Sequence, residues 1–222
     1  MESWGIVDSK RTIFDWFFFR SSVRAALDGE YNADNIQGPF VLVPIFGGNS
    51  FRTSANTDIT LPDSAVIGLN YKATDKLDLE VDLGWTGWCE FDHFDFTYGT
   101  TNAVLNAGNP SQHKFRDTVS VNVGASYKIN QNWSAMTGYS YFQRAALEND
   151  YSNVFPDGDR HNIPIGIQYH TDKFSIALAY DAQFVSKVSI DNNVGSPNGA
   201  SIDGDYEGIY HVVLGSVTYK FG

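Results

Sequence analysis

The sequence predicts an all-β protein, an antiparallel transmembrane β-barrel of which this chain supplies about eight strands. Hydrophobic and polar residues alternate in several segments. In 118–128, Val119, Val121 and Val123 share one face, and Ser120 and Asn122 share the other. Alternation with a period of two is typical of a strand whose two faces differ. Tight turns and long loops also alternate along the chain, as they do in outer-membrane barrels.

The apolar runs are too short for membrane-spanning helices, which need roughly 20 residues. The longest apolar segments are 12–19 and 39–46. A spanning strand needs only about 9–11 residues, half of them polar. The mean hydropathy of −0.26 therefore does not exclude the membrane, and strands are the expected spanning elements.

Counting the alternating segments gives eight predicted strands. They cover residues 13–31, 57–73, 76–92, 117–129, 132–146, 160–170, 173–190 and 208–221. Three connections are tight (73–76, 129–132 and 170–173) and four are long (32–56, 93–116, 147–159 and 191–207). The tight turns are expected on the periplasmic side and the long loops outside. Pro62 and Pro164 each remove a ladder donor, so a bulge or kink is expected at both.

A weak internal repeat marks the tight turns. The segments 68–76, 124–132 and 166–173 share a Gly, a Tyr and a polar turn. Aromatic residues expected to ring the membrane boundary beside the turns are Tyr71, Tyr127, Trp133, Tyr169, Phe174 and Tyr219. Those expected at the other boundary are Trp85, Tyr139, Tyr141 and Tyr180. The alternative is a soluble β-barrel or sandwich with the apolar face inward, in which aromatics rarely occupy both ends of successive strands.

Composition restricts the function further. The 222 residues carry a net charge of −11, which argues against a nucleic-acid partner. The single cysteine, Cys89, cannot form an internal disulfide. The N-terminus lacks the basic start and apolar run of a signal peptide. Together with the predicted strands, this leads us to expect an incomplete chain.

Catalytic patterns are missing from the sequence. The five histidines are scattered, and we find no HExxH, GxSxG or phosphate-binding loop. We therefore predict no enzyme activity, no cofactor and no metal. Asp78, Glu80 and Asp82 line one face of a predicted strand and could form a cation site or an acid/base pair. Solvated charges in the barrel lumen explain them more simply.

An apolar run inside the loop 32–56 is a candidate ligand site. An exposed apolar patch costs free energy unless something covers it. A bound hydrophobic ligand is one cover, and a small core formed by the loop itself is the alternative. The candidate binding residues are Phe40, Val41, Leu42, Val43, Ile45 and Phe46.

Two arginines share the polar face of the first predicted strand. Arg20 and Arg24 are expected to point into the lumen, where they could hold a carboxylate through charge-assisted hydrogen bonds. Pairing with Asp78 or Asp82 is an equal alternative. Arg160 is expected to cap its loop through Asp157 or Asp159.

Several motifs, in this order, resemble those of FadL-type transporters of long-chain fatty acids. They are an Arg-Ser strand end, a Leu-Pro strand followed by a paired-Trp strand, an Asn-Trp…Thr-Gly-Tyr hairpin, a Pro-Asp-x-Asp-Arg segment and a closing strand. In this sequence they lie at 19–23, 60–92, 117–143, 155–169 and 208–222. The resemblance makes 18–222 the C-terminal part of an outer-membrane barrel and 1–17 a poorly matching N-terminal segment.

The resemblance implies passive transport of fatty acids or other hydrophobic molecules across the bacterial outer membrane. A fourteen-stranded barrel with an N-terminal plug is implied, in which the loop at 32–56 captures the ligand before it diffuses through the lumen. The partners would be a hydrophobic ligand, outer-membrane lipid and the missing N-terminal half of the barrel. Trp88 and Phe142 would line the lumen, with room left at Gly68, Gly124, Gly138 and Gly166.

One departure weakens a carboxylate site in the lumen, because Met136 stands where the family often has an arginine. Two competing functions remain. A small eight-stranded structural or adhesion barrel would close on itself and conduct nothing. An outer-membrane lipid enzyme would need a Ser/His/Asp constellation that the sequence lacks.

Overall fold

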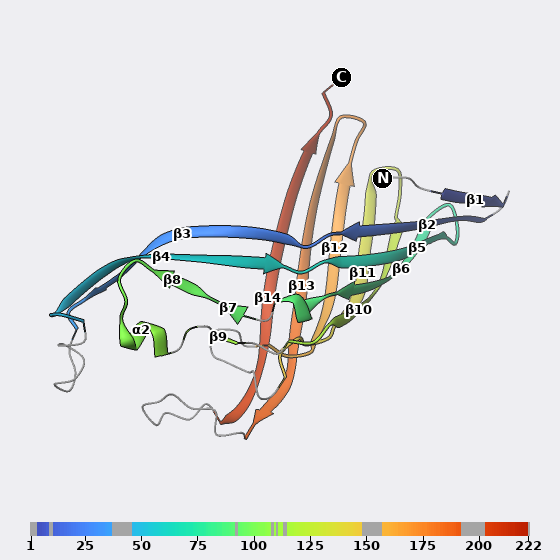
Figure 1. Ribbon diagram of the computed structural model, residues 1–222. Helices are drawn as coiled ribbons and strands as arrows, with labels where there is room; N and C mark the ends of the chain where they lie inside the picture. The colour runs from blue at the N-terminus through green and yellow to red at the C-terminus, as the bar shows by residue number, and fades with distance from the viewer. Residues whose placement is uncertain are drawn as a thin grey trace.

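The computed structural model describes residues 4–8, 11–36, 46–91, 93–107, 109, 111–112, 115–147, 157–191 and 203–221. Strands dominate it (Figure 1). The longer strands are β2 (Arg11–Arg20), β3 (Val23–Asp34), β4 (Ser50–Leu61), β5 (Ser64–Lys72), β6 (Leu77–Thr86), β10 (Thr118–Lys128), β11 (Trp133–Phe142), β12 (Arg160–His170), β13 (Phe174–Ile190) and β14 (Gly204–Tyr219). The short elements are β1 (Trp4–Asp8), the 3₁₀ turn η1 (Trp88–Glu90), β7 (His93–Phe94), β8 (Phe96–Tyr98), α2 (Ala103–Ala107) and β9 (Ser111–Gln112).

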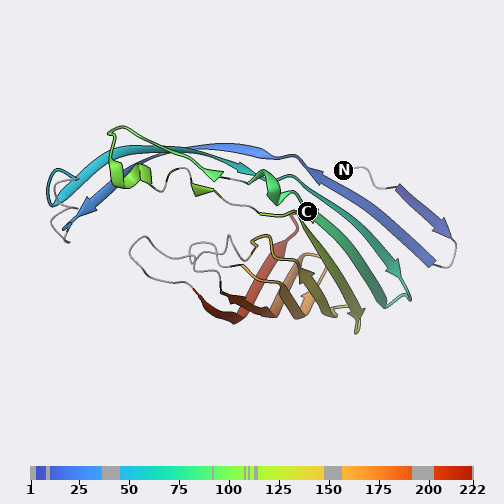
Figure 2. The same cartoon turned by 60° about the horizontal axis from the view of Figure 1, so that its bottom comes forward.

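Nine strands form one antiparallel sheet in the order β1-β2-β5-β6-β10-β11-β12-β13-β14. Figure 2 shows that this sheet is curved. Within the described residues, its edge strands β1 and β14 do not pair with each other, and neither does β2 with β14. The prediction of an incompletely closed barrel sheet is confirmed.

The first two predicted strands each break where the chain leaves this sheet. The predicted strand 13–31 divides at Ser21–Ser22 into β2 and β3, and the strand 57–73 divides at Pro62–Asp63 into β4 and β5. Pro62 has no N–H to donate to a ladder, which confirms the expected interruption there. β3, β4 and β8 form a separate three-stranded sheet. Residues 32–56 are therefore not all loop, because the paired strands β3 and β4 both extend into this range (Figure 1).

The other strand predictions hold closely in the middle of each strand and less well at some ends. β11 ends at Phe142 instead of residue 146, and β14 begins at Gly204 instead of residue 208. β12 covers the predicted residues, and β10 and β13 differ from the prediction by one residue at their ends. β6 ends at Thr86 instead of residue 92, because the chain turns into η1.

Pro164 interrupts pairing without adding a residue. β12 pairs with β11 on both sides of Pro164 in one unchanged register, and the pairs at Gly138 and Tyr139 are missing. A bulge occurs instead in β13, between Val185 and Val188.

The tight turns at 73–76, 129–132 and 170–173 are confirmed, and each has a side-chain cap. The side-chain oxygens of Thr74, Asn130 and Thr171 accept hydrogen bonds from the backbone N–H groups two and three residues later. Each such bond contributes about 0.5–1.5 kcal/mol. The shared polar residue of the sequence repeat thus has a structural role.

The apolar face of the sheet points outward. Val119 and Val123 are 49% and 42% exposed, whereas Ser120 and Asn122 lie half-buried on the opposite face. In the described part of the chain, the buried hydrophobic residues are Ala145, Ala146, Val188 and Ile190. A soluble barrel would bury its valines in a core. We call the face with Ser120 and Asn122 the inner face and the other the outer face.

Aromatic residues follow the outer face beside the tight turns, as predicted. The rings of Trp133 and Tyr169 are 5.0 Å apart, and those of Tyr169 and Phe174 are 5.9 Å apart. Phe174 is in register with Tyr219 on β14. Amphipathic rings at this position suit a membrane boundary. No helix in the described ranges is long and apolar enough to cross a membrane.

Candidate functional site

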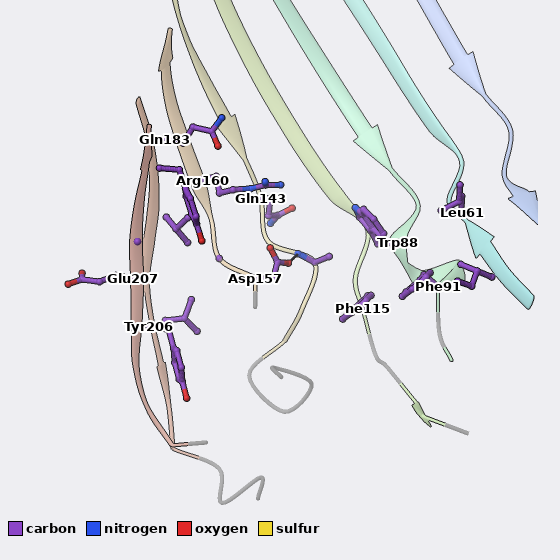
Figure 3. Close-up of a pocket in the computed structure, with 17 residues that line it drawn as sticks. Leu61, Trp88, Phe91, Phe115, Gln143, Asp157, Arg160, Gln183, Tyr206 and Glu207 are labelled. Atoms are coloured by element: carbon purple, nitrogen blue, oxygen red, sulfur yellow. Dashed lines mark hydrogen bonds between the residues drawn. The ribbon is translucent and has the colours of Figure 1, made fainter. Parts of the chain in front are cut away.

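A cavity of about 980 Å³ lies at the end of the sheet opposite the tight turns (Figure 3). We call it the mouth cavity. Side chains from β4, from the segment around η1 and from the ends of β12, β13 and β14 distant from the tight turns line it. The principal lining residues are Ile59, Leu61, Trp88, Phe91, Phe115, Gln143, Arg160, Gln183, Val188 and Tyr206.

Three aromatic rings form one wall of the mouth cavity. Phe91 and Phe115 stack in parallel with centroids 5.7 Å apart. Trp88 meets both rings nearly edge-on, at 6.1 Å and 6.5 Å. Aromatic pairs of this kind contribute about 0.5–1.5 kcal/mol beyond their buried area. The wall is therefore apolar and internally packed.

The end of β6 positions this aromatic wall. The Gly87 N–H donates to the Asp63 carbonyl at 3.0 Å, and a Cβ at this glycine would lie 2.3 Å from Asp63 Oδ1. Glycine fits this close approach, and the chain turns there into η1. Asp117 Oδ1 then accepts the Cys89 N–H at 3.1 Å. These bonds bring Trp88 and Phe91 toward Phe115 from a separate segment.

Arg160 lies on the opposite wall, at the start of β12. Its guanidinium lies 5.7 Å from the centroid of the Phe142 ring, a cation–π arrangement. The ion pairs within the described residues are Arg24–Asp58, Lys128–Asp78 and Lys187–Asp205, and none involves Arg160. Arg160 is therefore a cation without a carboxylate partner in this part of the chain.

The expected pairing of Arg160 with Asp157 or Asp159 is wrong. Asp157 Oδ2 accepts the backbone N–H groups of Ala145 and Ala146 at 2.6 and 3.0 Å. Asp159 Oδ1 accepts the Arg144 N–H at 2.8 Å. The two carboxylates thus accept backbone N–H groups of residues 144–146, which follow β11 and no longer pair with a neighbouring strand. Glu207, the other acid at the cavity, points away from it in Figure 3.

Among the binding residues predicted from sequence, Trp88 lines the mouth cavity. Phe142 is not one of the lining residues, but its ring lies 5.7 Å from the guanidinium of Arg160, which is. Phe40, Val41, Leu42, Val43 and Ile45 lie outside the described residues. Phe46 lies within them, and its ring is 5.3 Å from that of Phe51.

The two predicted arginines are not at the cavity. Arg20 ends β2 opposite Ser64. Arg24 was expected to point into the lumen, and this is wrong because the chain leaves the barrel sheet at Ser21–Ser22. On β3, the exposed Arg24 guanidinium pairs with Asp58 at 2.5 Å instead of with Asp78 or Asp82.

Sequence reasoning missed Phe91, Phe115 and Arg160 as lining residues. The aromatics Trp88, Phe91 and Phe94 follow Gly87 in a segment that no longer alternates, and that loss of alternation was an available signal. Arg160 carried no comparable signal, because the acids beside it suggested a cap.

The glycines of the inner face offer less room than expected. Of the four, Gly124 alone has open space where a Cβ would stand, with no described atom within 4 Å. A Cβ at Gly68 would lie 2.2 Å from the Trp16 ring, and one at Gly138 would lie 2.8 Å from the Val123 carbonyl oxygen. Neighbouring groups already fill these two notches.

The acids of β6 form no metal site in the part of the chain that the structure describes, where no three His, Cys, Asp or Glu side chains gather as ligands. Asp78 Oδ2 lies 4.0 Å from Lys128 Nζ. A loose ion pair on the inner face is the arrangement observed.

An unclosed antiparallel sheet with an apolar outer face, a ring of aromatics beside its turns and an apolar cavity at the far end defines part of an outer-membrane β-barrel transport protein. The chain belongs to the family described as "Outer membrane protein transport protein (OMPP1/FadL/TodX)", whose model matches residues 7–221. This is a bacterial outer-membrane family of transporters and not of enzymes.

Two curated relatives illustrate the similarity. An outer membrane protein of Neisseria meningitidis serogroup B is 27% identical over 178 residues, covering 77% of this chain and 38% of the relative. The long-chain fatty acid transport protein of Escherichia coli O6:H1 is 24% identical over 160 residues, covering 68% of this chain and 34% of the relative. The chain thus spans less than half the length of either protein.

Solved structures share the fold. A Pseudomonas aeruginosa FadL homologue superimposes with a TM-score of 0.72 at 23% identity, covering 97% of this chain and 49% of that chain. The Ralstonia pickettii toluene transporter TbuX gives 0.54 at 12% identity, covering 96% and 45%. The Escherichia coli relative is thus named for long-chain fatty acids, and TbuX for toluene.

Proposed function

We propose that this chain is the C-terminal part of a passive outer-membrane channel and that its mouth cavity captures a long-chain fatty acid. The observation that carries the proposal is the presence, in one cavity, of an aromatic wall and of Arg160, which pairs with no carboxylate among the described residues. Trp88, Phe91 and Phe115 would hold the acyl chain, and Arg160 would hold the carboxylate.

The two walls suit an amphiphile with a single anionic head. Apolar burial contributes about 25 cal/mol per Å², so an acyl chain gains free energy on leaving water for the aromatic wall. A guanidinium forms short, charge-assisted hydrogen bonds to a carboxylate. The Phe142 ring restrains Arg160, which lowers the entropy lost when the ligand binds.

Diffusion down a gradient would complete the transport, because the sequence carries no nucleotide-binding motif. The apolar segment 40–46 would make the first contact with ligand outside the cavity. Its residues Phe40, Val41, Leu42, Val43, Ile45 and Phe46 keep the capture role predicted for them. Arg20, at the end of β2, would attract the carboxylate from a distance.

The rest of the barrel would come from the N-terminal half of a longer protein. Among the described residues, both edges of the nine-stranded sheet leave backbone N–H and C=O groups unpaired, and each such group costs several kcal/mol in lipid. The small adhesion barrel is disfavoured for the same reason, since it would need β1 or β2 to pair with β14.

A neutral aromatic hydrocarbon is the second candidate ligand, and the three-ring wall favours it. The two ligands make different demands on Arg160, because a carboxylate accepts charge-assisted hydrogen bonds from the guanidinium and a hydrocarbon accepts none. Binding of oleate and of toluene to the purified full-length protein tests the proposal. Phe91→Ala should weaken oleate binding, and the matched control Phe17→Ala, on the outer face, should not. Equal binding by both variants and by the wild type would contradict the mouth cavity as the ligand site.

A further inference from the structure

The aromatic residues of β2 that share the inner face form a column. Phe14, Trp16 and Phe18 are in register with Asn70, Gly68 and Val66 of β5. The neighbours of these partners, Ile67 and Leu69, are 56% and 46% exposed on the outer face. Because side chains alternate along a strand, the column lies on the inner face with the mouth cavity.

Trp16 lies directly over Gly68. A Cβ built at Gly68 would be 2.2 Å from both Cε2 and Nε1 of the Trp16 indole and 2.6 Å from Asp82 Oδ1. No side chain beyond hydrogen fits under the indole. Gly68 therefore sets the position of Trp16 against the sheet.

The remainder of the inner face at this level is polar. The residues in register from β6 to β13 are Asp82, Asn122, Ser140, Asn162 and Gln183. Buried oxygens of Asp82 and Asn162, Oδ1 in each, have no hydrogen-bond partner among the residues that the structure describes. The polar side chains of this row are only half-buried, and an apolar ligand passing against them would strip water from their accessible atoms, which is unfavourable.

The aromatic column begins at the level of the mouth cavity. Phe18 belongs to the register row that runs through Val66, Gly84, Ser120 and Phe142 to Arg160. Trp16 lies two residues further from the cavity, and Phe14 two beyond that. Among the described residues of the inner face, the column is thus an apolar surface that starts level with the cavity and leads away from it along β2.

We propose that the inner face of β2 is the track along which the ligand leaves the mouth cavity, with Trp16, seated on Gly68, as its selecting residue. The inference rests on the proposed function and adds to it a path and a specificity residue. The column must stay apolar for a hydrophobic ligand to pass, while capture in the cavity does not depend on it.

Two substitutions at Trp16 distinguish a role in ligand passage from a role in packing alone. The full-length protein would be expressed in cells that lack their own fatty acid transporter, and both surface binding and uptake of labelled oleate would be measured. Trp16→Gln should slow uptake about tenfold, because it places one polar group on the path of the apolar ligand. It should leave surface binding unchanged. Trp16→Leu should stay within about twofold of wild type because it remains apolar. Phe17→Leu, on the outer face, is the matched control.

Gly68→Leu provides an independent test, because it fills the notch and forces Trp16 off the sheet. Uptake should fall while surface binding persists. Equal loss in Trp16→Gln and Trp16→Leu, with a folded heat-modifiable barrel in both, would overturn the track and leave Trp16 a packing residue. Unchanged uptake in Trp16→Gln would also overturn it without touching the proposed function. Absence of oleate binding and uptake in the wild type would overturn both.

Discussion

The guanidinium of Arg160 lies 5.7 Å from the centre of the Phe142 ring, on adjacent strands that the register places side by side. This relationship places a cation on the wall of the mouth cavity that lies opposite the aromatic wall. Since Asp157 and Asp159 are engaged with backbone amides, Arg160 remains available to a ligand carboxylate.

Arg160→Gln should weaken oleate binding by about ten- to a hundredfold, because a charge-assisted hydrogen bond contributes about 1.5–3 kcal/mol. Methyl oleate, which has no carboxylate charge, should bind the variant and the wild type alike. Isothermal titration with both ligands measures the difference. Arg24→Gln removes an exposed arginine already paired with Asp58 and is the control. A parallel loss for both ligands would show that Arg160 acts only through packing.

Gly138 and Gly124 face each other in the β10–β11 ladder and should respond differently to alanine. A Cβ at Gly138 would lie 2.8 Å from the Val123 carbonyl oxygen, a backbone atom that cannot move aside. Gly138→Ala should therefore lower the free energy of unfolding by about 1–3 kcal/mol. Gly124→Ala should change it little, because no described atom lies within 4 Å. Urea unfolding in lipid vesicles compares them, and equal values would mean that the close approach is relieved elsewhere.

Val121 and Asn122 are neighbours on opposite faces of β10 and test which face meets lipid. Arginine at Val121 should destabilise the protein by about 2–4 kcal/mol if that position lies near the membrane midplane. Arginine at Asn122 should cost far less, because the inner face holds polar groups. The same vesicle-based unfolding measures both. A larger penalty at Asn122 would reverse the assignment of the faces.

The extension of β13 and β14 beyond the bulge should depend on pH. Lys187 Nζ and Ser189 Oγ both lie 2.7 Å from the Asp205 carboxylate, and the Lys187 bond, then the Ser189 bond, lower the pKa of Asp205. A lowered pKa stabilises the fold above the ordinary carboxyl range, and that contribution is lost as the pH falls through the lowered value.

Amide exchange at Ile190 and Gly204, a register pair at the end of this extension, should therefore accelerate below about pH 4. Asp205→Asn should exchange rapidly across the whole range and lose the dependence. A wild-type protein whose exchange in this pair is flat after correction for intrinsic rates would refute the role of Asp205.

The sequence predicts a strand or a site well where neighbouring residues determine it, and poorly where contacts between distant segments do. Alternation located β10, β12 and β13 within a residue because strand faces repeat every two positions. The break at Ser21–Ser22 has no such signature, since the residues on both sides suit strands. Arg24 was misplaced for that reason.

The mouth cavity could not be predicted from sequence, because residues far apart in the chain form it. Phe91 and Phe115 stack although they are far apart in the chain, and η1 determines their approach. Arg160 meets Phe142 because of the β11–β12 register. Trp88 and Phe142 could be proposed as lining residues only through a family resemblance.

Photo-crosslinking can locate the site at which the protein captures a hydrophobic carboxylate. A diazirine-bearing fatty acid would be bound to the full-length protein in outer-membrane vesicles, irradiated, and its attachment sites mapped by mass spectrometry. We expect labelling of Trp88, Phe91 and Phe115 that excess oleate abolishes and Arg160→Gln weakens. Labelling confined to outer-face residues such as Val213 and Val217, unaffected by oleate, would rule out capture in the mouth cavity.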